Sequence, residues 1–340
     1  MGKIKISDIA KEANVSISTV SNYLNERFEN MSSQTKENIR SIIEKTKYSP
    51  SLGARRLSQK SKSKTICIII PRNIKYVFST PFFAEVMKGI ADSVDELGYR
   101  TILFTSQGGN IKDDIQYLQG LGHNLVDGFL IFDVKEHDIY VEKLEEAGLP
   151  FICFGKYQND SPKYVATDHE NGANIATNHF IFHGHKRISI IDYEKESIVA
   201  KQKINGYSKA LKENNISFDE KLVIHAKTGS EDIYNSCAQL IESKNPPTAF
   251  YIPHSHVREL LKCISDKGKK VPEDFAIILN EFFPSYLNND INYTYIKAPV
   301  YEVGFKGVVK LIDIINSKNF MSSSEELLPI ELVIGSTCGC

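Results

Sequence analysis

The sequence of 340 residues lacks a membrane-spanning run, a secretion signal and a dense set of cysteines. No apolar stretch approaches the ~20 residues that cross a bilayer. Met1 leads into lysines and a polar Ser-Asp pair rather than into an apolar signal region. Only 6 cysteines occur, four within apolar runs and two at positions 338 and 340. This usage predicts reduced, mostly buried thiols, and we expect a cytoplasmic protein.

The net charge is also close to zero, with a formal total of −1. Taken alone, this value argues against a nucleic-acid partner. The two signs are segregated, however. Residues 1–64 hold 13 basic and 6 acidic side chains, a net of +7, while the remainder holds 28 and 36, a net of −8. A basic head on an acidic body predicts a polyanion-binding module joined to a separate body. A merely solvated charged segment is the alternative interpretation.

The basic head has apolar residues at helical spacing, which predicts helices over residues 6–13, 17–24 and 33–45. Ser7 and Ser16 are expected to cap the first two helices, and Asn14 suits the left-handed turn between them. Two short helices joined by a tight turn, with a third completing the core, predict a helix-turn-helix domain. A small bundle for protein contacts is the alternative, which the charge disfavours.

The second helix has a polar face of small hydroxyls and amides that can reach phosphates and base edges. The DNA-contacting residues predicted in the head are Ser7, Ser16, Ile17, Ser18, Thr19, Ser21, Asn22 and Asn25. After Pro50, which stops the third helix, residues 52–58 are too few for a helix that is stable alone. The basic linker over 59–64 either follows a polyanion or stays mobile.

From residue 65 onward, short apolar runs alternate with amphipathic stretches. Strands are predicted at 65–70, 100–105, 128–132 and 151–154, and the alternation restarts at Tyr164 with strands at 188–191, 222–224, 249–252 and 275–279. Two such series predict two doubly wound parallel-sheet subdomains with a ligand cleft near the strand carboxyl ends. The expected fold class is therefore an all-α helix-turn-helix head plus an α/β body.

The run ISDIAKEANVSISTVS at residues 6–21 and the segment 48–57 resemble the opening and the hinge of the LacI/GalR family of bacterial transcriptional regulators. Further similar segments follow in the same order at 81–86, 126–128, 184–188, 271–274 and 298–304, so the resemblance covers essentially the whole chain. It implies a dimer with two recognition helices in successive major grooves of a pseudo-palindromic operator. It also implies paired hinge helices in the minor groove, contacting DNA through Ala54, Arg55 and Leu57, with Leu57 as an apolar wedge.

The resemblance implies a body of periplasmic-binding-protein type, in which the chain crosses between subdomains three times. We expect these crossings near Pro162, Asn292 and Ser322. The predicted domains are a head over 1–48, a hinge and linker over 49–64, and an effector-binding and dimerisation body over 65–340. Within the body, subdomain 1 is expected over about 65–162 and 293–322, and subdomain 2 over about 163–292 and 323–340.

The expected effector cleft departs from the family pattern. Lys203 stands where the family usually has Arg, which removes a planar hydrogen-bonding fork. The other departures are Thr80, His254, Ser255 and Glu281, while Phe82, Phe282 and Phe283 offer either a stacking surface or core packing. These residues predict a pocket for an unusual small ligand, such as a sugar or sugar derivative. A degenerate pocket, with control by a partner protein or no ligand control, is the alternative.

Catalytic and metal motifs are missing from the sequence. There is no G-x-S-x-G elbow, P-loop or H-E-x-x-H, so no enzyme and no cofactor are expected. The histidine pairs at 183/185 and 254/256 lack a clear third ligand, so no metal site is predicted. Cys338 and Cys340 either bind a soft metal, form a strained bridge or belong to a frayed tail, which we favour because no other cysteine pair completes a ligand set.

Together these observations predict a sequence-specific DNA-binding regulator, with a repressor of carbohydrate-related genes favoured, whose operator affinity depends on a small ligand. A sugar-binding module without a DNA function leaves the +7 head unexplained. No membrane partner is expected.

One departure in the second helix predicts an altered base preference. The family often has Arg at the position of Asn22, and Arg reads guanine whereas Asn fits adenine. We expect Asn22→Arg to change the preferred base at one symmetric operator position by ~1–3 kcal/mol. Selection from randomised DNA with both proteins measures this, and an unchanged selected operator would contradict it.

Overall fold

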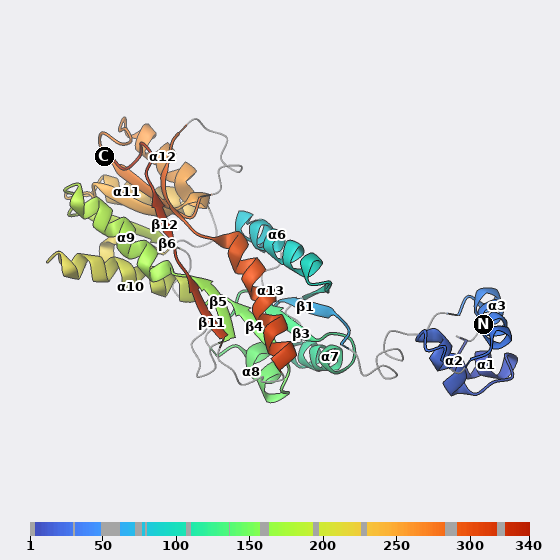
Figure 1. The fold of residues 1–340 in the computed structure, drawn as a ribbon. Coiled ribbons are helices and arrows are strands. Elements are labelled where there is room, and N and C mark those ends of the chain that lie inside the picture. The colour runs from blue at the N-terminus through green and yellow to red at the C-terminus, as the bar shows by residue number, and fades with distance from the viewer. Residues whose placement is uncertain are drawn as a thin grey trace.

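The computed structural model describes residues 4–29, 31–48, 62–71, 77–78, 80–106, 110–135, 137–156, 163–192, 197–225, 230–282, 291–317 and 324–340. It contains a three-helix head and a two-lobed α/β body (Figure 1). The predicted hinge contacts Ala54, Arg55 and Leu57, together with Phe283 and the crossing residues Pro162 and Ser322, lie outside these ranges. Within them, none of the helices combines the length and apolarity needed to cross a bilayer.

The head consists of α1 (Ile6–Glu12), α2 (Ile17–Leu24) and α3 (Ser33–Thr46), which confirms the predicted helices. They pack around a core that includes the fully buried Ile9, Val20 and Ile39. Between α1 and α2, Asn14 adopts the left-handed conformation with φ of 53°, as expected of the turn. The Ser16 hydroxyl caps α2 by accepting the Thr19 N–H at 3.0 Å.

The predicted cap of α1 was wrong. Lys5, not Ser7, is the N-cap residue, and its backbone N–H donates to the Asp8 carboxylate at 2.8 Å. A carboxylate is a stronger acceptor than a hydroxyl and interacts favourably with the helix amino terminus. Ser7 therefore lies within the first turn, where it is exposed.

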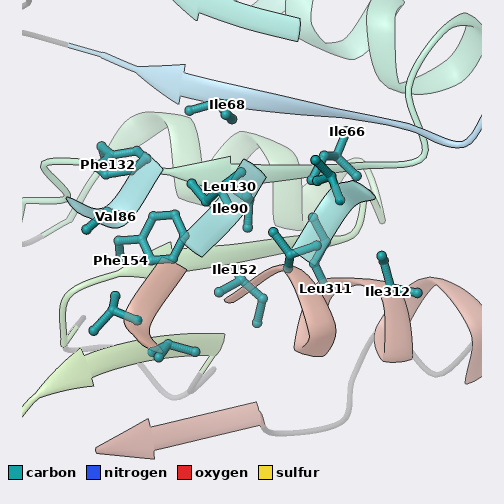
Figure 2. Close-up of a cluster of buried hydrophobic side chains, with 14 of the residues drawn as sticks. Ile66, Ile68, Val86, Ile90, Leu130, Phe132, Ile152, Phe154, Leu311 and Ile312 are labelled. Atoms are coloured by element: carbon teal, nitrogen blue, oxygen red, sulfur yellow. The ribbon is translucent and has the colours of Figure 1, made fainter. Parts of the chain in front are cut away.

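The first lobe is built on sheet A, a parallel sheet with the strand order β11-β5-β4-β3-β1-β2. Its strands are β1 (Thr65–Ile70), β2 (Arg100–Thr105), β3 (Gly128–Ile131), β4 (Phe151–Phe154), β5 (Lys163–Thr167) and β11 (Ser324–Leu328). Helices α6 (Pro81–Glu96) and α13 (Val300–Ser317) cover one face, and α7 (Ile111–Asn124) and α8 (Ile139–Glu146) cover the other. Figure 2 shows the first interface, where Ile66 and Leu130 from the strands meet Ile90 and Leu311 from the helices.

The second lobe is built on sheet B, with the strand order β12-β10-β9-β8-β6-β7. Its strands are β6 (Ile188–Asp192), β7 (Val223–His225), β8 (Ala249–Pro253), β9 (Ala276–Asn280), β10 (Thr294–Lys297) and β12 (Glu331–Val333), of which only β12 runs antiparallel to its neighbour. Helices α9 (His169–Phe182) and α10 (Ile198–Glu213) cover one face, and α11 (Ser230–Ile241) and α12 (Val257–Asp266) cover the other. The doubly wound architecture predicted for both lobes is confirmed.

The strand pairing differs from the predicted subdomain boundaries. β5 and β11 pair with each other in sheet A, although the predicted boundaries place them in subdomain 2. β10 belongs to sheet B, although it was assigned to subdomain 1. The transitions therefore fall a few residues later, after β5, after β10 and after β11. An apolar run marks a strand, but its sheet is chosen by non-local pairing that the run does not encode.

The end of the basic linker is bonded to the first lobe, chiefly through the carboxylate of Asp127. The buried Asp127 accepts the backbone N–H groups of Ser63 at 2.9 Å and Lys64 at 2.7 Å. The Asp127 N–H donates to the Thr65 carbonyl at 2.7 Å, which starts β1 beside β3. The last two residues of the linker are thus fixed to the first lobe, directly before β1.

In each lobe, two helices come into close backbone contact at glycine residues. A Cβ added to Gly304 of α13 would overlap the Val86 carbonyl of α6, and one added to Gly89 of α6 would overlap the Tyr301 carbonyl of α13. In the second lobe, Gly206 of α10 lies equally close to the Glu170 carbonyl of α9. Each pair of helices therefore packs backbone against backbone, as the figure shows for α6 and α13 (Figure 1).

The cysteines fall into two groups. Cys67, Cys153, Cys237 and Cys263 are free and buried, which confirms the predicted thiols. Cys338 and Cys340 form a disulfide, and Cys338 has no exposed surface. The prediction of a frayed tail was wrong, because the preceding residues hydrogen-bond to sheet B.

The glycine contact in the first lobe predicts a strong effect of a single methyl group. We expect Gly304→Ala to lower the unfolding free energy by ~1–3 kcal/mol, because α6 and α13 must separate. Gly120→Ala is the matched control, since Gly120 lies in α7 with open space around its Cα. The control gains up to ~1 kcal/mol of helix propensity. Urea unfolding of both variants measures the contrast, and a neutral Gly304→Ala would refute it.

Candidate DNA-binding and effector sites

The second helix of the head presents the predicted DNA-contacting residues outward. Val20 is buried, whereas Ile17 is 52% exposed and Ser18 and Asn22 are also exposed. Exposure of an apolar Ile beside hydroxyl and amide groups suits contact with base edges and thymine methyl groups. Thr19 differs from this group, because its hydroxyl pairs with that of the Ser16 cap at 2.8 Å.

The remaining predicted contacts of the head flank this surface. Ser7 and Ser16 are exposed, while Ser21 and Asn25 are half-buried. Positions 17, 18, 21, 22 and 25 follow helical periodicity, so they share one side of α2. The most exposed of the predicted DNA-contacting residues on this side of α2 are therefore Ile17, Ser18 and Asn22.

Most of the net positive charge of residues 1–64 lies after the head rather than on it. Residues 1–48 hold 8 basic and 6 acidic side chains, a net of +2, whereas residues 49–64 hold 5 basic and no acidic side chains. Two basic side chains of α3 are also paired, Lys45 with Glu12 and Arg40 with Glu44, each at 3.0 Å. The net charge that can neutralise phosphates is therefore concentrated in residues 49–64.

In the body, polar residues gather at the carboxyl edge of sheet B. The neighbouring strands β6, β8 and β9 end at Asp192, Pro253 and Asn280, and His254 and Glu281 follow the last two. The Tyr251 hydroxyl donates to the Asn280 side chain at 3.2 Å. Parallel strands place these strand-end groups at one edge, and the predicted effector residues His254 and Glu281 are among them.

Lys203 lies at the centre of this edge. It projects from α10, is 3% exposed, and its Nζ lies 3.4 Å from Asp192 Oδ1, whose side chain is 1% exposed. Two buried charges of opposite sign compensate each other's desolvation only in part, since their separation exceeds an ideal hydrogen bond. The pair therefore places one basic and one acidic side chain together at this edge, both buried.

Glu281 faces a histidine that the sequence prediction missed. Its backbone is left-handed, with φ of 57°, and its carboxylate lies 3.7 Å from His169 Nδ1. Burial raises the pKa of Glu281, opposed by Lys203 and reinforced by Asp192. Burial and then Lys203 lower the pKa of His169 to about 3, so its imidazole is neutral and shares a hydrogen bond of 2.8 Å with the Thr167 hydroxyl.

His254 and Ser255 begin a short 3-10 helix that ends at His256. Burial lowers the pKa of His254, while its hydrogen bond to the Glu281 backbone raises it. Burial also lowers the pKa of His256. Ser255 is exposed, so the neutral imidazole of His254 is the group that adjoins the edge.

The other predicted effector residues do not join this group through any contact among the described residues. The Thr80 hydroxyl donates to the Val77 carbonyl at 2.8 Å, and Phe82 packs against the core of the first lobe. Phe282 packs against Tyr293 and Tyr295, with ring centroids 5.5 and 5.0 Å apart. Core packing thus accounts for Phe282, the interpretation that the sequence left open.

Sequence inspection missed Asp192 and His169, although both have a usable signal. Asp192 ends an apolar strand, and His169 begins a helix two residues after the end of another strand, in the sequence Thr-Asp-His. Polar residues directly after buried strands are the ones that parallel topology collects. His169 also lines a cavity of about 330 Å³, together with Thr167, Gln202 and Leu327.

Comparison with known proteins agrees with both parts of the chain. A model of bacterial regulatory proteins of the LacI family matches residues 5–51, and a model of periplasmic binding proteins and the sugar-binding domain of the LacI family matches residues 63–252, more than half of the chain. The chain belongs to the LacI family. It is therefore a DNA-binding transcriptional regulator with an effector-binding body.

Relatives extend over the full length of this LacI-family chain. The HTH-type transcriptional repressor PurR of Photobacterium profundum is 28% identical over 341 residues, covering 97% of each chain. The ribose operon repressor of Halalkalibacterium halodurans is 26% identical, covering 98% of this chain and 96% of the relative. The lac repressor dimer bound to operator and the anti-inducer ONPF has the same fold, with a TM-score of 0.77 and 18% identity over 99% of each chain.

The neutral, buried His169 predicts a loss of stability in acid. A histidine whose folded pKa lies below its unfolded value of ~6.5 stabilises the fold above that value, and this contribution disappears as the pH falls toward about 3. Between pH 7 and pH 5 we expect His169 to remove ~2 kcal/mol of unfolding free energy.

Urea unfolding at both pH values measures this loss for the wild type and for His169→Gln. The variant should lose less stability by about that amount, and subtraction removes the contribution of Glu281 and other groups. An equal loss in both proteins would show that His169 is not buried in its neutral form.

Proposed function

We propose that this regulator is a homodimeric, sequence-specific repressor whose operator affinity is set by a small polar ligand at the carboxyl edge of sheet B. The observation that carries the proposal is the convergence of Lys203, Asp192, Glu281 and His169 at this edge. Buried acceptors and one buried cation match a ligand with several hydroxyl groups. The ribose operon repressor among the relatives supports a carbohydrate or a derivative of one.

The lac repressor structure, which shares this fold, is a dimer bound to operator. That likeness supports a dimer here, in which two α2 helices enter successive major grooves through Ile17, Ser18 and Asn22. Ala54, Arg55 and Leu57 are assigned to the minor groove, as the hinge sequence suggests. We place the head at 1–48, the hinge and linker at 49–64 and the body at 65–340, acting in the cytoplasm, where operator DNA lies.

Regulation follows from two features of the body. His169 comes directly after the first transition between lobes and faces Glu281 across the site, so a ligand bound there shifts the lobes. Asp127 holds the end of the linker on the first lobe, so that shift reaches the hinge. Ligand and operator affinities are then coupled, and the coupling is reciprocal.

One observation favours an alternative, in which the pocket responds to no small ligand. Lys203 and Asp192 pair within the chain, so the edge has a charge partner for its cation without any added molecule. In that case a partner protein controls the regulator, or its affinity is constant. Neither scheme assigns a catalytic role to any residue.

A gel shift of the full chain on its own upstream DNA tests the proposal. Specific binding should fall by orders of magnitude as salt rises, because basic residues of the hinge and linker displace counterions. Leu57→Ser should weaken specific binding and DNA bending while leaving the melting temperature unchanged. An equal loss of thermal stability would instead identify Leu57 as a core residue.

The effector is tested in the same assay after a thermal-shift screen of sugars, sugar phosphates and nucleosides. A ligand that raises the melting temperature should change operator affinity in the wild type and fail to do so in Glu281→Gln, which should still bind DNA. If no compound shifts the wild type, the alternative without a small ligand is supported. If the full chain binds no DNA specifically, the proposed function is wrong.

A further inference from the structure

A second cluster of ligand-type side chains lies away from the effector edge. Cys338, Cys340 and His179 each offer one atom, and these atoms all lie within 4.8 Å of one another. The Cys340 Sγ is 3.4 Å from His179 Nε2. The three residues come from α9 and from a segment some 160 positions further along the chain, so only the fold brings them together.

We propose that Cys338, Cys340 and His179 form a binding site for a thiophilic cation of the Zn²⁺ type in the reduced protein. A tetrahedral ion with metal–sulfur bonds of ~2.3 Å and metal–nitrogen bonds of ~2.0 Å keeps its ligand atoms ~3.5–3.8 Å apart. The 3.4 Å separation of Cys340 Sγ from His179 Nε2 is close to this range, and the two sulfurs, bonded to each other in the disulfide, reach it by moving apart on reduction. Two sulfurs and an imidazole nitrogen are ligands that select zinc over calcium or magnesium.

The segment that carries the cysteines is held in place before any metal binds. The Thr337 hydroxyl donates to the Ile277 carbonyl at 2.8 Å and accepts the Thr294 N–H at 3.0 Å. The Ile277 N–H donates to the Thr337 carbonyl at 2.6 Å, and the Ser336 N–H donates to the Asn292 carbonyl at 2.6 Å. Little backbone entropy remains to be lost on binding, which favours affinity.

The Cys-Gly-Cys geometry directs both sulfurs to one point. Gly339 has a φ of 76°, a conformation that favours glycine and folds the chain back between the two cysteines. Cys338 is fully buried, whereas Cys340 is exposed and His179 is half-buried. A cation therefore reaches the site from the Cys340 side, where water occupies the fourth position.

The other cysteines do not compete for the ion. Cys67, Cys153, Cys237 and Cys263 are all buried, and burial raises the pKa of each thiol. A thiol must lose its proton to bind a metal, so these four are poor ligands.

The disulfide between Cys338 and Cys340 is the alternative state of the same pair. Two small thiols reduce it by exchange, supplying two electrons and two protons and themselves becoming a disulfide. A phosphine instead supplies the two electrons and becomes a phosphine oxide, while water supplies the oxygen and the two protons. Zn²⁺ then displaces the two thiol protons. Cytosolic thiols keep cysteines reduced, so the metal-binding state prevails wherever the regulator meets operator DNA. Oxidation by a thiol oxidant releases the ion.

The site is distinct from the candidate effector site. Ile277 is bonded to the cysteine segment near the start of β9, and Glu281 follows the end of that strand. Four residues at ~3.3 Å each separate them by ~13 Å, so the two sites occupy opposite edges of sheet B. Metal binding ties α9 to the segment 334–340 without occupying the effector cleft.

Zinc binding to the full-length chain tests the proposal. Phosphine-reduced wild type, freed of metal, should bind one Zn²⁺ per chain in competition with a chromophoric chelator. Co²⁺ should give a thiolate-to-metal charge-transfer band. Cys340→Ser and His179→Gln should each weaken binding at least about tenfold and remove or diminish that band. His123→Ala, which replaces an exposed histidine near the end of α7, is the matched control and should bind as the wild type does.

Two outcomes would overturn the proposal. One is reduced wild type that binds no Zn²⁺, and the other is equal binding by wild type, Cys340→Ser and His179→Gln. Protein oxidised with diamide should not bind, and undiminished binding there would also contradict it. Circular dichroism and operator binding confirm that each variant folds. Failure of operator binding in the wild type would refute the proposed function but not this site, because zinc binding is measured without DNA.

Discussion

Parallel strand pairing is the constraint on which the arrangement of this regulator depends. A parallel sheet requires each strand to return by a crossover, so every strand ends at the same edge. In sheet B this places Asp192, His254 and Glu281 next to one another, although they lie far apart in the sequence. The same rule places the starts of the strands at the other edge, where α9 ends near the two cysteines. The proposed effector site and the proposed metal site therefore lie at opposite ends of the strands of one sheet.

The exchange of strands between the lobes places the proposed effector site beside a connection between them. Sheet A recruits β5 and β11, and the chain enters the second lobe immediately after β5. His169 lies at that entry and faces Glu281 within the second lobe, so the proposed effector site adjoins a connection between the lobes. Asp127 occupies the corresponding position between the first lobe and the linker. Gly304 and Gly206 each allow two helices of their lobe to pack backbone against backbone.

Much of the local structure was predictable because its causes are local. The Ser16 cap, the left-handed Asn14 and the apolar strands depend on a few consecutive residues, and the structure confirms them. The Ser7 cap failed because Asp8, one residue later, offers a stronger acceptor for the Lys5 N–H. The predicted subdomain boundaries differ from the strand pairing because the sequences of β5, β10 and β11 carry no signal of which sheet each strand joins.

The candidate effector site was predictable in part. Lys203, His254 and Glu281 could be proposed from the positions of strand ends, but Asp192 and His169 could not be ranked above other polar residues without distances. Burial distinguishes His169 from other polar residues, because it lowers the pKa of that histidine. It also raises the pKa of Glu281, which faces His169. Thr80 and Phe82 show the converse, since their contacts stay within the first lobe.

The sequence by itself determined the helix-turn-helix head, the division of charge and the doubly wound lobes, because these follow from periodicity, capping and composition. Only the tertiary structure decided which strands belong to which lobe, which polar groups share the effector edge, and that His179 completes a cluster with Cys338 and Cys340. Those outcomes depend on contacts between distant parts of the chain, and no local pattern records which distant residue a side chain will meet.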